Sequence, residues 1–393
     1  MPIVLVVMVM LFVLATMVLA MVAQSTFSST RRTAQTKAVH MADAGLNAYL
    51  YELRRNPSYY VAHPTLGPTT LEDGTWSVAS TAPTSEDPLM LRVTGAIPSM
   101  DSTSVVIASV RFPTYADYMF LTDAFNRIGS GATIVGKVRS NEYIENDGRI
   151  TGVAEAVDHI SGSGVFGGGK KCPVPIVDFA QVTADLGDIR NMATAAGTYF
   201  GPSGALGYRA TVSGNRVTVL KITAMNTTTG VISSSTTVGI YTIPASGVMY
   251  FNDKVYVSGT YSERLTIASA QTIYIVDNFV PANLNSTATS GLIGAQDIIV
   301  PTRFTSVPST MQVTAALLAQ NGQIYGECYS GYYKTKITIL GSIACKGQPY
   351  FVSGSTGWAS RVYDYDERLD IHPPPMFPQI RDGTLKISTW NED

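Results

Sequence analysis

The first 23 residues are almost entirely apolar. Between Met1 and Ala23 only Pro2 and Thr16 interrupt the apolar run, and the first charged residue is Arg31. A helix of roughly 20 such residues spans the hydrocarbon core of a bilayer. A secretory signal peptide would instead carry a basic start and a shorter apolar stretch of about 7–15 residues. The pattern therefore predicts a membrane-spanning or assembly helix rather than a signal peptide.

The apolar run continues into an amphipathic pattern without a break. No glycine or proline occurs between Pro2 and Gly45, and the next proline is Pro57. Apolar residues recur at helical spacing after residue 37. We predict one helix over residues 1–56, from about Ile3 to Asn56 and roughly 80 Å long at 1.5 Å per residue.

The two halves of this helix are expected to have different surroundings. Residues of the first half would pack in lipid or against other helices: Val4, Leu5, Leu11, Val13, Leu14, Leu19 and Phe27. Residues of the second half would pack on the chain's own ectodomain: Met41, Leu46, Tyr49, Leu50 and Leu53.

Short alternating stretches follow the helix and predict a small antiparallel β module over residues 57–114. The expected strands are Thr75–Ser80, Met90–Ala96 and Ser104–Arg111, with turn-rich pieces between them. Packed on the amphipathic half of the helix, they would form an α+β unit. A membrane-proximal β-domain of another kind fits the same pattern.

Residues 115–393 are predicted to form a β-rich ectodomain, which makes the whole chain α+β and mostly β. Short alternating segments such as Val255–Val257, Ile273–Ile275 and Ile337–Ile339 are separated by Gly, Asn and Asp. Units this short cannot bury a face alone, so stacking them favours a β-solenoid (β-helix), with a β-sandwich as the alternative. A helix and a hairpin at about residues 177–250 would be an insertion that caps the stack or forms a partner surface.

Three segments carry a resemblance to a known family. The N-terminal pattern resembles the first helix of a mature type IV pilin, and Met41–Asn47 (MADAGLN) is similar to the A-E-A-G-L-N motif of minor pilins of the PilX type and their relatives in Gram-positive bacteria. Arg361–Leu369 with Pro373–Pro378 resembles the terminal motif of the larger members, and Ala316–Gly322 matches a third stretch. The resemblance implies a structural subunit of a pilus-like filament.

The chain departs from the pilin pattern at its start. Pilins keep a glutamate at the fifth position of the mature chain, where this sequence has Leu5. No basic leader precedes Met1, so the sequence is expected to begin where a prepilin peptidase would cut. The missing glutamate favours a tip position or a divergent filament.

Composition narrows the classes of partner and chemistry. The net charge is −2 and the basic residues form no stripe, so nucleic acid is not an expected partner. Of three cysteines, Cys328 and Cys345 lie about 17 residues apart, and export favours a bridge between them worth roughly 3 kcal/mol. Cys172 has no evident partner.

Candidate catalytic and metal-binding residues are sparse. The four histidines, His40, His63, His159 and His372, lack metal-ligand spacing. Glu142, Glu145 and Asp147 form the one dense acidic group, expected on a solvated turn, and the glycines from Gly162 to Gly169 are expected to form a flexible linker. We predict no enzyme activity, no cofactor and no metal.

The C-terminal tail, residues 361–393, is expected to dock along the ectodomain or across a neighbouring subunit rather than remain mobile. Three consecutive prolines cannot extend a sheet and favour polyproline II. Large side chains in the tail are too many for free solvent, and the predicted docking residues are Tyr363, Tyr365, Leu369, Pro373, Pro374, Pro375 and Phe377.

Three function classes remain from the sequence. The first is a subunit of an extracellular type IV pilus-like filament, partnered by copies of itself or other pilins and, before assembly, by the cytoplasmic (inner) membrane and its pilus machinery. The second is a membrane-anchored adhesin or binding protein without filaments. The third, weakest class is a β-helix enzyme acting on surface glycans.

Overall fold

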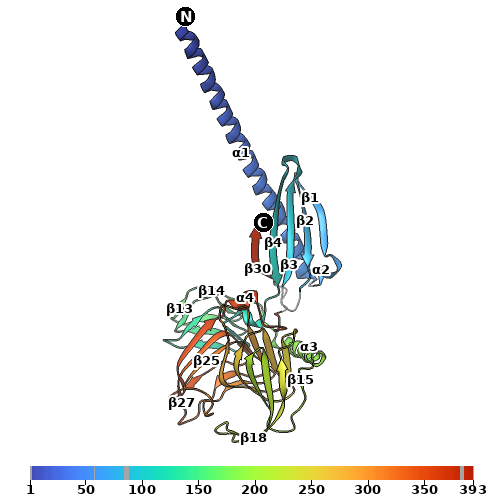
Figure 1. Cartoon of the computed structure of the whole chain (residues 1–393). Coiled ribbons are helices and arrows are strands. Elements are labelled where there is room, and N and C mark those ends of the chain that lie inside the picture. The colour runs from blue at the N-terminus through green and yellow to red at the C-terminus, as the bar shows by residue number, and fades with distance from the viewer. Residues whose placement is uncertain (1, 57, 84–87, 381–384, 393) are drawn as a thin grey trace. The chain divides into compact units, whose positions relative to one another are not determined.

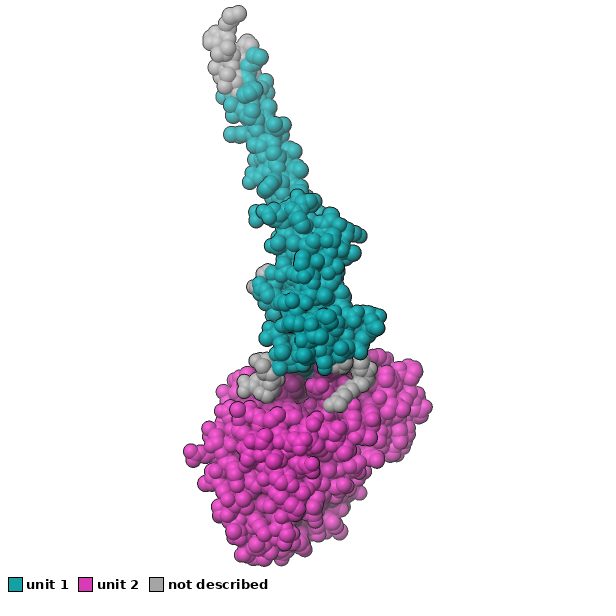
Figure 2. Space-filling view, turned by 90° about the vertical axis from the view of Figure 1, so that its right-hand side faces the viewer, with its two compact units in different colours: residues 1–111, 383–393 teal, residues 112–382 magenta. Residues whose placement is uncertain are grey.

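The computed structural model describes residues 2–56, 58–83, 88–380 and 385–392, and the chain divides into two compact units. Unit 1 comprises Met1–Arg111 and Gly383–Asp393, and unit 2 comprises Phe112–Asp382 (Figure 2). The sequence placed the end of the β module at residue 114 and the whole tail in the ectodomain. The structure differs because the last strand of the chain belongs to unit 1.

Unit 1 begins with the helix α1 (Pro2–Arg55), which ends where Pro57 blocks a further turn. The long N-terminal helix followed by a mostly β chain is confirmed. A single turn, α2 (Tyr59–Ala62), leads from the helix into the sheet.

The sheet of unit 1 is fully antiparallel, with strand order β1-β2-β3-β4-β30. Its strands are β1 (Thr65–Leu71), β2 (Gly74–Thr81), β3 (Leu89–Ile97), β4 (Ser102–Arg111) and β30 (Lys386–Glu392), with the 3-10 turn η1 (Pro98–Met100) before β4. In β2, β3 and the first half of β4, buried and less buried positions alternate, as the polar and apolar pattern predicts.

The two outer strands of this sheet are absent from the prediction. The strand β1 contains Gly67 and Pro68, which argue against a strand in a sequence but are tolerated at a sheet edge. The strand β30 pairs with β4, Trp390 lying opposite Ala108, and so joins residues from opposite ends of the chain (Figure 1). No local pattern could indicate that pairing.

Unit 2 starts with the 3-10 turn η2 (Tyr115–Asp117) and a run of very short parallel strands. They are β5 (Phe120–Thr122), β6 (Asn126–Ile128), β7 (Thr133–Val135), β8 (Val138–Ser140), β9 (Ile144–Asn146), β10 (Arg149–Ile150), β11 (Ala154–Ala156), β12 (Ile160–Ser161), β13 (Val165–Phe166) and β14 (Lys170–Lys171). Thr133, Arg149 and Val165 pair in register, so successive strands on this side are offset by 16 residues.

A second run of strands occupies the rest of unit 2. It consists of β15 (Tyr199–Phe200), β16 (Tyr208–Gly214), β17 (Arg216–Met225), β18 (Ile232–Thr242), β19 (Val248–Phe251), β20 (Val255–Tyr261), β21 (Leu265–Ser269), β22 (Ile273–Pro281), β23 (Ser290–Gly294), β24 (Ile298–Val300), β25 (Thr310–Ala319), β26 (Ile324–Gly326), β27 (Tyr333–Cys345), β28 (Val352–Ser353) and β29 (Thr356–Tyr365). From β19 to β27 the neighbours across the sheet are parallel.

The two runs join into one stack. Ile343 of β27 pairs with Phe120 of β5, and Tyr363 of β29 pairs with Ile134 of β7, in both cases in parallel. Inward-facing side chains of both runs belong to a single buried cluster. Unit 2 therefore starts near the middle of the stack with β5 and builds outward to β14. The chain then continues at the other end with β15–β18 and builds back to the middle at β29.

The insertion at about residues 177–250 contains the expected helix and hairpin. Asp178 caps the turn η3 (Phe179–Gln181), which continues into α3 (Val182–Ala195) before Gly197. The hairpin is β16–β17, extended by β18, and it buries Val217 and Val219 against the end of the stack. The hairpin thus closes this end of the core, whereas α3 contributes to a second cluster on the outer face of β19, β21, β23 and β25.

Candidate functional site: the N-terminal helix and the docked tail

The first half of α1 presents its apolar side chains outward. Among the predicted assembly residues, Leu11, Val13, Leu14, Leu19 and Phe27 are exposed, from 45% for Val13 to 74% for Leu19. Val4 and Leu5 lie within the helix, but their side chains are outside the described residues. Figure 1 shows this part of α1 extending beyond the sheet of unit 1. By length and composition, α1 is the one helix among the described residues that could cross a membrane.

The stretch of α1 after the apolar run is rich in Ser and Thr. The hydroxyls of Thr26, Thr30, Thr33 and Thr36 each donate to the carbonyl four residues earlier, at 2.9–3.0 Å. A hydroxyl bonded in this way does not need water, which lowers the cost of placing it among apolar neighbours.

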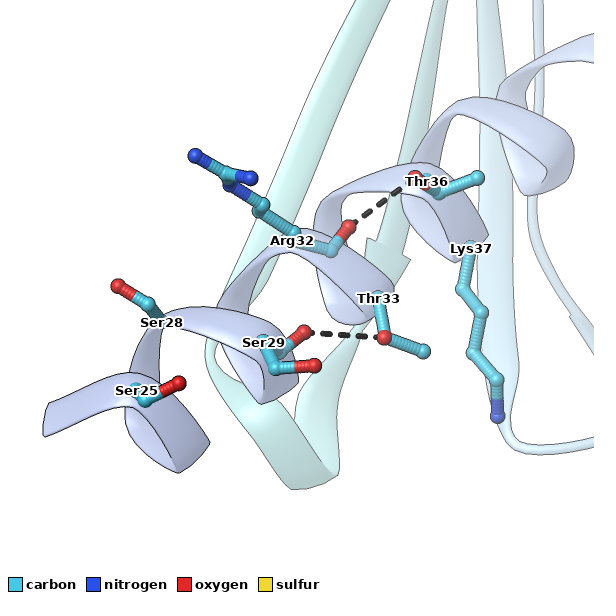
Figure 3. Close-up of a pocket in the computed structure, with 7 residues that line it drawn as sticks. All are labelled: Ser25, Ser28, Ser29, Arg32, Thr33, Thr36 and Lys37. Carbon is cyan, nitrogen blue, oxygen red and sulfur yellow. Dashed lines mark hydrogen bonds between the residues drawn. The ribbon is translucent and has the colours of Figure 1, made fainter. Parts of the chain in front are cut away.

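Two of these threonines, Thr33 and Thr36, border a shallow hollow along the helix together with three serines. Figure 3 shows the lining side chains, with Arg32 and Lys37 pointing in different directions. The Lys37 Nζ atom lies 2.7 Å from Asp73 Oδ2 in the turn between β1 and β2. This contact raises the pKa of Lys37 and lowers the pKa of Asp73. The Lys37–Asp73 ion pair thereby connects α1 to the sheet of unit 1.

The second half of α1 packs on β2, β3 and β4 of its own sheet. Every predicted packing residue, Met41, Leu46, Tyr49, Leu50 and Leu53, is buried there. The Tyr49 hydroxyl donates to the His63 carbonyl at 2.7 Å and lies 3.2 Å from Ser80 Oγ. Burial raises the pKa of Tyr49, since the phenolate would lose its hydration.

One close approach of α1 to its sheet involves residues that the sequence prediction missed as a contact. A Cβ atom on Gly95 of β3 would lie 2.1 Å from the Ala38 carbonyl oxygen and 2.4 Å from the Ala42 nitrogen. One face of α1 therefore touches the strand backbone directly. The signal was Ala38 and Ala42, two small residues one helical turn apart, but nothing in the sequence identifies Gly95 as their partner.

Residues 361–380 of the C-terminal tail lie along unit 2. Tyr363 and Leu369 are buried, at 8% and 1% exposure, and the Tyr365 hydroxyl donates to Asp370 Oδ1 at 2.7 Å. Arg368 binds Asp366 at 2.6 Å and also donates to the Ala288 carbonyl at 3.1 Å. A one-turn helix, α4 (Arg368–Ile371), connects these contacts to the proline segment.

The proline segment is held by side chains that reach its carbonyl groups. Thr289 Oγ1 donates to the His372 carbonyl at 2.7 Å, Arg264 donates to the Pro373 carbonyl, and Thr266 Oγ1 donates to the Pro375 carbonyl at 2.6 Å.

Two glycines make room for the segment. A Cβ on Gly247 would lie 2.5 Å from Pro375 Cγ, and one on Gly291 would lie 2.7 Å from the Phe377 ring and 3.0 Å from Pro374 Cβ. The tail therefore lies against the outer face of the parallel sheet, where Leu369 and Phe377 belong to the same buried cluster as α3.

The predicted disulfide is absent: Cys172, Cys328 and Cys345 are all free thiols. Cys345 is the last residue of β27 and is fully buried in the inner core, where its Sγ approaches the Gly347 carbonyl at 2.9 Å. Cys328, two residues beyond β26, instead lines a surface pocket. Their spacing in sequence suggested a bridge, but one thiol faces the interior and the other the surface.

The acidic residues Glu142, Glu145 and Asp147 form hydrogen bonds and an ion pair within the fold. Asp147 Oδ1 accepts from Ser163 N and Oγ, both at 3.0 Å, which lowers the pKa of Asp147. Glu145 pairs with Arg127 at 2.6 Å, and the Glu142 carboxylate accepts from Phe125 N at 3.1 Å. The acidic group thus joins adjacent levels of the stack.

The histidines do not meet at a metal site. His159 forms an exposed pair with Asp158 at 2.9 Å and stacks on Tyr143, while His63 stacks on Tyr59. His40 is exposed on α1 and His372 lies in the tail. Within the described ranges no group of three potential metal ligands occurs.

The glycine-rich segment expected to be a linker is part of the stack. Its strands β13 and β14 pair in parallel with β10 and β11. A Cβ on Gly168 would lie 2.4 Å from the Gly152 carbonyl carbon, so the glycine permits close approach of two backbones rather than flexibility.

Comparison with known proteins finds distant similarity among solved structures. A scan of protein-family models and a search of curated proteins find no match. Among solved structures, the competence-associated pilin ComZ from Thermus thermophilus is similar at 12% identity and a TM-score of 0.32, over 92% of this chain and 98% of that chain. A similarity of this size establishes neither a common function nor a family, so the following proposal rests on the residues of this chain.

Proposed function

We propose that this protein is a pilin-like structural subunit that assembles through the apolar half of α1 and displays unit 2 at the surface of an extracellular filament. One observation carries the proposal: a single continuous helix is buried on its own sheet over its second half and exposed and apolar over its first half.

The exposed half requires a partner. Side chains such as Leu19 and Phe27, more than 70% exposed in the isolated chain, gain roughly 25 cal/mol per Å² when removed from water. A bilayer can supply this environment before assembly, and neighbouring helices of the same kind can supply it afterwards. The threonine hydroxyls donate to carbonyl groups of their own helix. This lowers the free-energy cost of packing other helices against α1 beyond the apolar run.

Finer features of the proposal follow from the fold and from the family resemblance. We infer a β-solenoid-like ectodomain, supported by the parallel pairs and the common inner core of both runs. The motif at Met41–Asn47 supports a PilX-type subunit, and Leu5 in place of glutamate favours a tip position or a divergent filament. Other pilins or further copies of this chain would be its partners. The protein would have a structural role, with no enzyme activity.

The decisive experiment compares filaments from cells that carry Leu19→Arg or, as the matched control, Val61→Arg. Both side chains are exposed, at 74% and 70%, but Val61 lies in α2 beside the sheet. A buried arginine between apolar helices has neither water nor a partner. We expect Leu19→Arg to remove the protein from sheared surface fibres while Val61→Arg leaves it there. Normal incorporation of Leu19→Arg would refute assembly through this helix.

The same experiment separates the proposal from a membrane-anchored adhesin. The length and composition of α1, which suit a single membrane span, favour this second candidate. An anchored monomer would remain in detergent-solubilised membranes and would be missing from sheared fibres for the wild-type chain as well. Mass spectrometry of the two fractions, with micrographs of the fibres, distinguishes the two functions.

A further inference from the structure

An aromatic ladder runs up one outer side of unit 2. Tyr256, Tyr274, Ile299, Tyr325 and Tyr350 occupy successive paired positions of parallel neighbours. The rings of Tyr256 and Tyr274 stack at 4.7 Å between centroids, and those of Tyr325 and Tyr350 stack at 5.0 Å with 10° between their planes. One side of the fold thus presents parallel aromatic rings in two pairs.

The two pairs differ in how they are covered. Phe304, itself 4% exposed, lies alongside Tyr256 and Tyr274 at 6.3 and 6.5 Å, and Tyr256 is only 6% exposed. At the other pair, Tyr350 is 37% exposed and lines an open pocket with Tyr325. A purely structural role of the stacked rings explains the covered pair, Tyr256 and Tyr274. It does not explain why the pocket beside Tyr325 and Tyr350 is open.

The pocket beside Tyr325 and Tyr350 has a volume of about 550 Å³, within the range of small-ligand sites. Its other lining residues include Glu327, Tyr329 and Ser353. Tyr329 is 47% exposed, and its ring is held by the Arg303 guanidinium 3.8 Å from the ring centroid. Three tyrosine rings, a carboxylate and a hydroxyl therefore face one hollow.

The charge balance of the pocket restricts the ligand. The carboxylate of Glu327 pairs with Arg303 at 3.3 Å, and both side chains are mostly buried. The pair leaves no net charge to attract an ion, while the carboxylate and the phenol and serine hydroxyls can bind neutral hydroxyl groups. The negative faces of aromatic rings attract the weakly positive C–H groups on one face of a saturated ring.

We propose that this pocket binds a neutral saccharide, with a sugar ring on the exposed tyrosine surface and its hydroxyls at Glu327 and Ser353. Sugars combine C–H faces and ring-edge hydroxyls, which is the combination that this lining offers. Binding here is independent of how α1 assembles, and it would give a filament or an anchored monomer a surface-recognition site.

Isothermal titration of the full-length protein tests the proposal, in a zwitterionic detergent because sugar-headed detergents would compete. The probes are the methyl glycosides of glucose, galactose, mannose and N-acetylglucosamine, with N-acetylneuraminic acid and a proline-rich peptide as alternative ligands. We expect at least one neutral glycoside to bind with a Kd of about 1 mM, the affinity of a single small contact. Binding of the acid or the peptide alone would overturn the proposal, as would no binding.

Substitutions locate the site. Tyr350→Ala should weaken binding about tenfold or more, whereas Tyr350→Phe keeps the ring and should stay within about threefold. Tyr143→Ala is the matched control, because Tyr143 is also partly exposed and stacks at 5.2 Å on Phe125 in another part of the unit. Equal losses for Tyr350→Ala and Tyr143→Ala at unchanged melting temperatures would place binding elsewhere. Fibre content is measured separately, so failure here leaves the assembly proposal standing.

Discussion

Gly95 of β3 lies so close to Ala38 of α1 that a Cβ at Gly95 would be 2.1 Å from the Ala38 carbonyl oxygen. The helix and its sheet thus touch backbone to backbone at this point. This contact allows the small residues of α1 to be fully buried without an intervening side chain. It makes Gly95 the position at which unit 1 should tolerate a side chain least.

We expect Gly95→Ala to destabilise unit 1 by about 1–3 kcal/mol, as overpacking of a close contact does. The control is Gly187→Ala in α3, where a Cβ meets nothing within 4 Å and alanine should favour the helix. Thermal or denaturant unfolding measures both variants, with a probe in unit 1 for Gly95→Ala and a probe in unit 2 for Gly187→Ala. Equal stability of Gly95→Ala and wild type would show that α1 and β3 are farther apart than in this structure.

The tail should depend on Arg368. Its guanidinium joins Asp366 to the Ala288 carbonyl, and its removal leaves the 7% exposed Asp366 side chain without this ion pair. We expect Arg368→Ala to cost about 1.5–3 kcal/mol, the range for hydrogen bonds to charged groups. It should also expose the bonds near Pro373–Pro375 to proteases.

Arg190→Ala on the outer side of α3 is the control for that experiment, because Arg190 is exposed. Limited proteolysis with mass spectrometry reads the result. If Arg368→Ala and Arg190→Ala are cut at the same rate, the tail is not held by this contact.

The three thiols should react in the order of their exposure. Cys172 is exposed, Cys328 is intermediate, and burial raises the pKa of Cys345 to about 12. We expect alkylation under native conditions to label Cys172 first and Cys345 only after unfolding, since the thiolate is the reactive form. Peptide mapping without reductant gives the counter-test, in which a linked Cys328–Cys345 peptide would contradict the free thiols.

The contact between Lys37 and Asp73 predicts a titration shift with a definite sign. Asp73 has its pKa lowered in the folded chain, so its ion pair persists above the usual value of 3.8 and is lost as pH falls through the folded-state pKa. The pKa of Lys37 is raised from 10.5, so on the alkaline side the pair is lost as pH rises through that higher value.

Lys37→Met should return the Asp73 carboxyl toward its ordinary pKa, as read by NMR titration of the carboxyl carbon. The matched variant is Arg54→Met, at an exposed residue near the end of the same helix. An Asp73 titration that is identical in wild type and Lys37→Met would mean that the two side chains do not pair in solution.

The local pattern of apolar and polar residues alone determined those helices and strands whose burial follows from their own residues. The continuous helix follows from the absence of proline between Pro2 and Pro57, and its two halves follow from the change from an unbroken apolar run to helical spacing. The three central strands of unit 1 follow from alternation, because one face of each is buried against α1. The hairpin at Ser213–Asn215 likewise follows from a local turn between alternating strands.

Tertiary structure decided everything that depends on residues far apart in the chain. Three contacts join segments whose local sequence does not indicate the partner. They are the pairing of β30 with β4, the contact of Gly95 with Ala38, and the contact of Pro375 with Gly247. Spacing and export predict a bridge between Cys328 and Cys345, but Cys345 lies in the inner core at the end of β27, whereas Cys328 lines a surface pocket beyond β26. In the sequence, the glycines from Gly162 to Gly169 predict a flexible linker. The backbone that approaches them belongs to another level of the stack, so the local sequence does not show why glycine is needed there. The short-range periodicity of apolar residues predicts which face of an element is buried. The segment that covers this face is determined only when the whole chain folds.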